Sequence, residues 1–122
     1  MPVRSSATSV LKWPDAASVL EAVRRWAAEE APRQAALLRL GLFGSYARGD
    51  AGVGSDIDLV AIVDASPERF DRRALTWRTE ALPLPAELLV YTEAEWEALV
   101  REGGRFARTI EREAVWLFVR PR

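Results

Sequence analysis

Residues 42–64, LFGSYARGDAGVGSDIDLVAIVD, constrain the fold of this chain more than any other stretch. An apolar run, LLRLGLF at 37–43, stops at the pair Gly44-Ser45, and a second run rich in branched apolar residues follows the loop. Apolar runs of this length, bounded by small and turn-forming residues, predict two strands, over 37–43 and 56–63. The small residues between the strands are then a turn and a loop that both strands hold in place.

Two aspartates open the second predicted strand and share one of its faces. Residues two apart on a strand point the same way, so Asp56 and Asp58 present both carboxylates on one side, about 7 Å apart along the backbone. Ile57 and Leu59 point the other way, toward a core. Two carboxylates on one face repel each other unless a proton or a cation intervenes. Such oxygen ligands suit Mg²⁺, which binds one or two carboxylates together with substrate phosphates.

The turn that ends the first strand is a candidate anion site. Gly44 lets the backbone approach a ligand closely or take a positive φ. Ser45 is expected to cap a short helix over residues 46–48, and the start of a helix offers N–H groups to an anion. Gly44, Ser45 and Arg48 are therefore candidate phosphate ligands, although Arg48 is equally compatible with a surface charge at a helix end.

Gly44-Ser45, ten intervening residues and then Asp56-Ile57-Asp58 together resemble the signature of the DNA polymerase β-like nucleotidyltransferase superfamily. The longer string GSYARGDAGVGSDIDLVAIVD is similar to the minimal nucleotidyltransferase (MNT) branch of that superfamily. The resemblance implies that Gly44 and Ser45 bind the triphosphate of a substrate such as ATP, and that Asp56 and Asp58 bind Mg²⁺. A P-loop is excluded, because no lysine follows a glycine-rich loop.

Glu87 is the candidate for a third carboxylate. Residues 86–91 predict a strand beside the one that carries the aspartates, and Glu87 is a lone acidic group among its apolar residues. In metal-assisted nucleotidyl transfer a third acidic group shares the metal and helps to remove the proton of the attacking hydroxyl. Related proteins usually carry aspartate here, so the longer glutamate leaves ligand geometry and activity open. The alternative is a solvent-facing residue on an edge strand.

The chain of 122 residues predicts one domain, with a flexible arm over 1–13 and an MNT domain over 14–122. Strands alternate with helices, so the fold class is α/β (α+β), a polymerase β-like nucleotidyltransferase core with a mixed sheet of about four strands flanked by helices. Toward the N-terminus we expect a helix capped by Asp15. A second helix is expected to open at Pro67, with Phe70, Ala74 and Trp77 facing the core. After the third strand we expect a helix with a Thr92–Glu95 capping box, a helical segment over 106–113 and a strand over 115–119.

Composition narrows the chemistry. The absence of cysteine and histidine excludes disulfides, the usual zinc ligands and the usual general base, which leaves carboxylates, hydroxyls, arginines and bound metal. A net charge of −1 argues against nucleic-acid binding through a bulk basic surface. No apolar segment approaches membrane-spanning length and no signal peptide is evident, so a cytoplasmic location without membrane association is expected.

The resulting expectation is an Mg²⁺-dependent nucleotidyltransferase (EC 2.7.7) that moves a nucleoside monophosphate, AMP from ATP, to a hydroxyl. Little chain remains once the core is built, so the acceptor is expected on another protein. The resemblance implies a HEPN-domain toxin as that partner and an antitoxin role for this chain. Two alternatives stay open: a catalytically weak module that neutralises a HEPN partner by contact, and a small-molecule enzyme like aminoglycoside nucleotidyltransferases. Homo-oligomerisation is left open as well.

Overall fold

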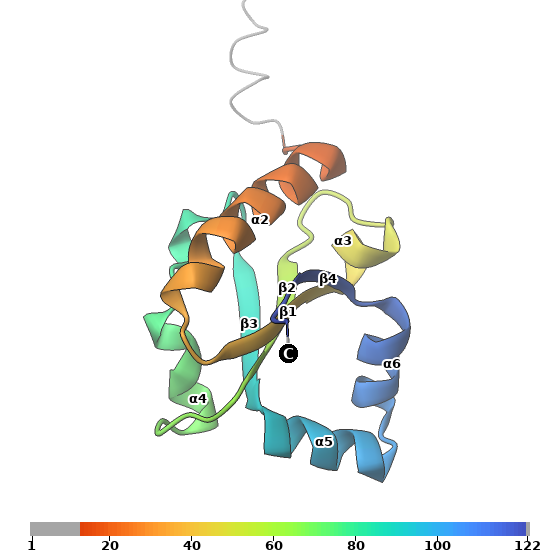
Figure 1. Cartoon of the computed structure of the whole chain (residues 1–122). Coiled ribbons are helices and arrows are strands. Elements are labelled where there is room, and N and C mark those ends of the chain that lie inside the picture. Colours follow the sequence, from red (N-terminus) through yellow and green to blue (C-terminus); the bar gives the residue numbers. More distant parts are fainter. Residues whose placement is uncertain (1–12, 122) are drawn as a thin grey trace, which may run out of the picture.

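The computed structural model describes residues 13–121, and its centre is a four-stranded sheet (Figure 1). The strands are β1 (Leu37–Phe43), β2 (Ile57–Val63), β3 (Ala86–Thr92) and β4 (Val115–Val119). All four predicted strands are therefore present, with ends that shift by one residue at most. The predicted arm lies outside the described residues except for Trp13, which packs against the core.

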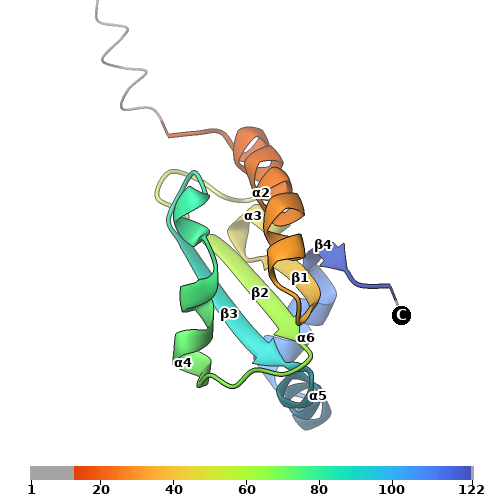
Figure 2. The ribbon, with the colours of Figure 1, turned by 60° about the vertical axis from the view of Figure 1, so that its left-hand side comes forward.

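The sheet is mixed, with the order β3-β2-β1-β4. β1 runs antiparallel to both β2 and β4, whereas β2 and β3 are parallel. The antiparallel pair β1–β2 is joined by the loop that contains the glycine-serine turn. The parallel pair needs a longer crossover, and the segment from α4 (Phe70–Arg73) to the start of β3 supplies it alongside β3 (Figure 2). The predicted mixed sheet flanked by helices is confirmed.

Helices cover both faces of the sheet (Figures 1 and 2). On one face lies α2 (Ala16–Glu30), whose start is capped by the Asp15 side chain, as predicted. Its apolar stripe joins the larger core with the inward side chains of β1, β2 and β3. On the other face α5 (Glu93–Glu102) and α6 (Arg105–Glu113) enclose a smaller core. No helix within residues 13–121 is long and apolar enough to cross a membrane.

The helix expected to open at Pro67 is wrong in its length. Instead of one helix the chain forms α4, of four residues, and two 3₁₀ turns at Ala74–Thr76 and Thr79–Ala81. Trp77 adopts an extended backbone and packs against Trp26, with ring centroids 6.1 Å apart. This packing interrupts the helix. Trp77 and Ala74 lie in or against the larger core, as predicted, whereas Phe70 is 41% exposed.

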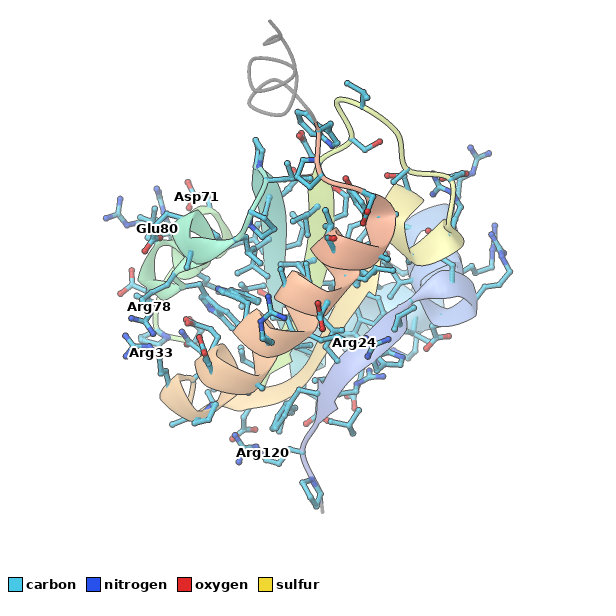
Figure 3. All side chains as sticks on the ribbon, turned by 90° about the horizontal axis from the view of Figure 1, so that it is seen from above. Arg24, Arg33, Asp71, Arg78, Glu80 and Arg120 are labelled. Atoms are coloured by element: carbon cyan, nitrogen blue, oxygen red, sulfur yellow. The ribbon has the colours of Figure 1, made fainter. Side chains whose placement is uncertain are left out.

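A buried carboxylate ties α2 to this irregular segment. Glu30 is fully buried and accepts hydrogen bonds from the Gln34 side chain and from the backbone N–H of Arg78. The guanidinium groups of Arg33 and Arg78 approach it to 3.8 and 3.6 Å, and both residues lie on the same side of the molecule (Figure 3). A buried charge is tolerated when it is paired and hydrogen-bonded in this way. These Glu30 contacts have a structural role, because they hold the irregular segment that leads into β3.

A second ion pair fastens α4 to the start of α5. The Arg73 guanidinium donates to both carboxylate oxygens of Glu95, at 2.6 and 3.1 Å, and to the backbone oxygen of Val90 at 3.1 Å. Glu95 also closes the capping box with Thr92, as predicted. The hydrogen bonds from Arg73 and Thr92 outweigh burial and lower the pKa of Glu95 to about 2.

This ion pair predicts a pH-dependent stability. Because the pKa of Glu95 is lower in the folded chain than its ordinary value of 4.5, its contribution is present above that value and is lost as the pH falls toward 2. Glu95→Gln keeps the capping box but loses the charge. Since the Glu95 side chain is 43% exposed, we expect a loss of about 1 kcal/mol at pH 7 and a much smaller loss at pH 2.5. Urea unfolding at both pH values measures it, and equal losses at both would contradict this account.

Candidate active site

The glycine-serine turn lies where β1 ends. Gly44 has φ 76° and ψ −155°, a backbone conformation that favours glycine, and it acts as the N-cap of α3 (Ser45–Arg48). The expected positive φ is therefore present. The expectation that Ser45 caps the helix is wrong, because Ser45 is already the first helical residue and Gly44 occupies the cap. The turn is closed by hydrogen bonds from the Ala47 and Arg48 N–H groups to the Gly44 carbonyl.

Gly44 is in close contact with the Asp58 carboxylate. A Cβ atom built on Gly44 would overlap Asp58 Oδ2 and would also press on its Cγ and Cβ. The close approach is possible because Phe43, the residue before the turn, is paired directly with Asp58 across β1 and β2. The turn and the first acidic side chain of the strand are therefore one packed unit, and a side chain on Gly44 would separate them.

Asp58 and Glu87 are direct neighbours across the parallel strands β2 and β3. Directly paired residues point to the same face, so the third predicted carboxylate lies on the same face as Asp58 rather than behind the sheet. Burial raises the pKa of Asp58, and the charges of Glu87 and Asp56 raise it further, while Arg48 lowers it. Asp56 precedes β2 by one residue and is exposed, as is Glu87 on its edge strand.

The acidic group suits a hard cation in chemistry and charge. Its donors are carboxylate oxygens, and the repulsion that raises the pKa of Asp58 is the kind that a divalent ion relieves. Within residues 13–121 no three acidic side chains already converge as a metal cluster. To share one ion, the Asp56 and Glu87 side chains would therefore have to rotate. Both are exposed to solvent, so no packing prevents this rotation.

One further carboxylate reaches the turn, and no sequence pattern predicts its position there. Glu113, the last residue of α6, accepts a hydrogen bond from the Gly44 N–H at 3.1 Å. Arg48 Nη1 lies 3.4 Å from the same carboxylate oxygen, and Arg48 Nε pairs with Asp50 at 3.1 Å. Glu113 stands 69 positions from Gly44, in a segment whose pattern predicts only a helix end.

The acidic residues line an open surface rather than an enclosed cavity. Asp56 and Glu87 are exposed, and Asp58 and Glu113 are half-buried. A hollow of about 320 Å³ beside the following loop is lined in part by Tyr46 and Val53 and by none of these carboxylates. A site of this shape admits a large acceptor as readily as a small one.

The chain belongs to the nucleotidyltransferase domain family, which its residues 24–117 match. That segment contains the glycine-serine turn, both aspartates, Glu87 and Glu113. Among curated proteins none matches this chain. The predicted membership in a nucleotidyltransferase family is confirmed.

Solved structures share the fold at low sequence identity. A Sulfolobus solfataricus protein described as a candidate nucleotidyltransferase is 20% identical, with a TM-score of 0.59 over 90% of this chain and 92% of its own. A toxin–antitoxin complex with AMP-PNP is 17% identical, with a TM-score of 0.53 over 82% of this chain and 73% of that one. A mutant MntA-HpeT toxin–antitoxin is 15% identical, with a TM-score of 0.51 over 88% of this chain and 75% of that one. These similarities establish the fold.

Three glycines test the contact between the turn and Asp58. We expect Gly44→Ala to cost both backbone strain, about 1–3 kcal/mol at its ψ of −155°, and the overlap with Asp58. Gly49→Ala also has a positive φ, of 87°, but nothing within 4 Å, so it should cost the strain alone. Gly52→Ala has neither and should be near neutral. Chemical unfolding of the three variants compares them, and equal losses for Gly44→Ala and Gly49→Ala would show that the overlap is relieved without cost.

The acidic group also predicts a stability gain on neutralisation. Because the pKa of Asp58 is raised in the folded chain, its charged form destabilises the fold above the ordinary value of 3.8 and ceases to do so as the acid protonates. Asp58→Asn should raise the free energy of unfolding by about 0.5–1 kcal/mol at pH 7 in EDTA. The gain should shrink toward pH 3. A loss of stability at pH 7 would mean that the Asp58 charge is satisfied in the fold.

Proposed function

We propose that this protein transfers AMP from ATP to a hydroxyl group of a partner protein, with Mg²⁺ as cofactor. The observation that carries the proposal is the meeting of the turn and the acidic residues. Asp58 packs on Gly44 and pairs across the sheet with Glu87. Family membership supports nucleotidyl transfer as the reaction class.

The roles of the residues follow from their positions. Gly44, Ser45 and Arg48 would hold the phosphates at the end of β1, and Asp56 and Asp58 would hold Mg²⁺ at the start of β2. Bound there, Mg²⁺ would supply charge neutralisation at the phosphates and a lowered pKa for the acceptor hydroxyl. The hydroxyl oxygen attacks the α-phosphorus, the bond to the bridging oxygen breaks and pyrophosphate leaves.

Glu87 is the group best placed to receive the proton of the acceptor hydroxyl. It lies opposite Asp58 on an edge strand and is exposed, so an acceptor can reach it from solvent. A carboxylate is a suitable general base in a chain without histidine. Holding the hydroxyl and the triphosphate together would supply much of the rate gain by positioning.

The proposed acceptor is a HEPN-domain toxin, with this chain as its antitoxin. The support is the sequence resemblance to the MNT branch and the similarity of the fold to two toxin–antitoxin structures, one of them with AMP-PNP. The open acidic surface suits a protein acceptor, because a side-chain hydroxyl must be delivered from a bulky body.

A second candidate is a docking module that neutralises the toxin by contact alone. Glu87 favours it, because a glutamate stands where related proteins usually carry aspartate. The two candidates differ in whether label from ATP reaches the partner. Toxicity blocked without transfer would support the module.

The metal assignment is tested by ligand binding and by transfer. With ATP at about a hundredfold its Kd, Mg²⁺ and ATP together should raise the melting temperature of the wild type by roughly 10 °C, and Asp56→Asn should show little of this rise. With α-labelled ATP and the HEPN-type protein, Asp56→Asn should lower transfer about a hundredfold or more. Glu87→Asp should retain more transfer than Glu87→Gln. Equal melting shifts in the wild type and Asp56→Asn would refute the metal role of Asp56.

A further inference from the structure

Glu113 takes up the two groups of the turn that a phosphate would need. Its Oε1 atom accepts from the Gly44 N–H at 3.1 Å and lies 3.4 Å from Arg48 Nη1. The Glu113 side chain is only 16% exposed, so this is a partly buried contact rather than a chance surface pair. Gly44 therefore has one carboxylate against its Cα, from Asp58, and another on its N–H.

The helix that carries Glu113 does not explain its position. Glu113 is the last residue of α6, where the partial negative charge of the helix end disfavours a carboxylate. The favourable energy that keeps Glu113 at this position must come from the groups that its carboxylate contacts, which are the Gly44 N–H and the Arg48 guanidinium. Hydrogen bonds to an ionised acceptor are roughly twice as strong as those to a neutral one. The contact with Glu113 therefore opposes the binding of another anion to the same groups.

We propose that Glu113 is an internal competitor for the phosphate-binding turn, which an incoming triphosphate displaces. The inference rests on the proposed function, since it takes Gly44 and Arg48 as phosphate ligands. One N–H cannot be donated fully to two anions, and the carboxylate and the phosphate also repel each other. Triphosphate binding therefore requires Glu113 to leave, and its departure frees Arg48 Nη1 for the phosphate.

The displacement is a movement of a side chain rather than of a helix. Ala107 and Ile110 anchor α6 in the smaller core, and the Ala114 N–H bonds to the Ile110 carbonyl. Rotation of Glu113 about its own bonds is enough to clear the turn. Its return after transfer would refill the Gly44 N–H and help pyrophosphate to leave. Glu113 would thus lower affinity for phosphate chains and speed their release.

The test measures binding of inorganic tripolyphosphate in EDTA, without a metal, a base or catalysis, by isothermal titration calorimetry. Glu113→Gln keeps the size and a neutral acceptor for Gly44 but removes the competing charge. We expect it to bind tripolyphosphate about five- to tenfold more tightly than the wild type. Glu111→Gln, an exposed site on the same helix, makes the same charge change away from the turn and should stay within about twofold.

A second variant, Glu113→Asp, keeps the test informative if Glu113→Gln does not fold. Glu113→Asp keeps the charge but is one methylene shorter, so it should hold the Gly44 N–H less well and also bind tripolyphosphate more tightly than the wild type. Equal or weaker binding by both Glu113 variants would overturn the inference, as would an equal gain in Glu111→Gln. Failure of tripolyphosphate to bind any of these proteins would overturn it too, because the turn would not be a phosphate site.

The outcomes separate this inference from the proposed function. If Glu113→Gln binds tripolyphosphate more tightly but no AMP reaches the partner, the inference stands and the transfer proposal fails. If AMP is transferred but the Glu113 variants bind tripolyphosphate no better than the wild type, the transfer proposal stands and the competitor role fails.

Discussion

The close packing of the Asp58 carboxylate against the bare Cα of Gly44 holds the candidate site together. It depends on the absence of one side chain and on a positive φ that glycine adopts without strain. The antiparallel register of β1 and β2 brings the two residues together, and the parallel register of β2 and β3 then adds Glu87 beside Asp58. Two strand registers and one glycine therefore bring the turn, Asp58 and Glu87 together at one face of the sheet.

The same arrangement sets stability against function. Burial and like charges raise the pKa of Asp58, so the acidic face weakens the fold at neutral pH. The scaffold has ion pairs away from the site, at Glu30, the last residue of α2, and between Arg73 and Glu95. At the turn itself Arg48 offsets part of the charge on Asp58, and Glu113 is paired with Arg48. Charge repulsion at the site, together with stabilising ion pairs elsewhere, is expected in a protein whose site must bind a highly charged ligand.

Much of this arrangement could be predicted from local sequence. The strands, the Asp15 cap and the Thr92 capping box follow from periodicity and from residue types whose preferences act over a few positions. Alternation along the predicted second strand put Asp56 and Asp58 on one face, and Glu87 was singled out as the lone acidic group of the predicted third strand. The broken helix after Pro67 was missed because Trp77 packs on Trp26, a contact between distant residues. Glu113 was missed for the same reason, since no local pattern reports a contact across 69 positions.

The most direct test of the central claim is a crystal structure with Mn²⁺ and a non-hydrolysable ATP analogue, in which anomalous scattering locates the metal. The account predicts a Mn²⁺ peak held by Asp56 and Asp58, with the analogue's phosphates on Gly44 and Ser45. The account would be contradicted if the metal and the triphosphate bound elsewhere on the chain, while the Asp58 carboxylate stayed against Gly44 and contacted neither of them.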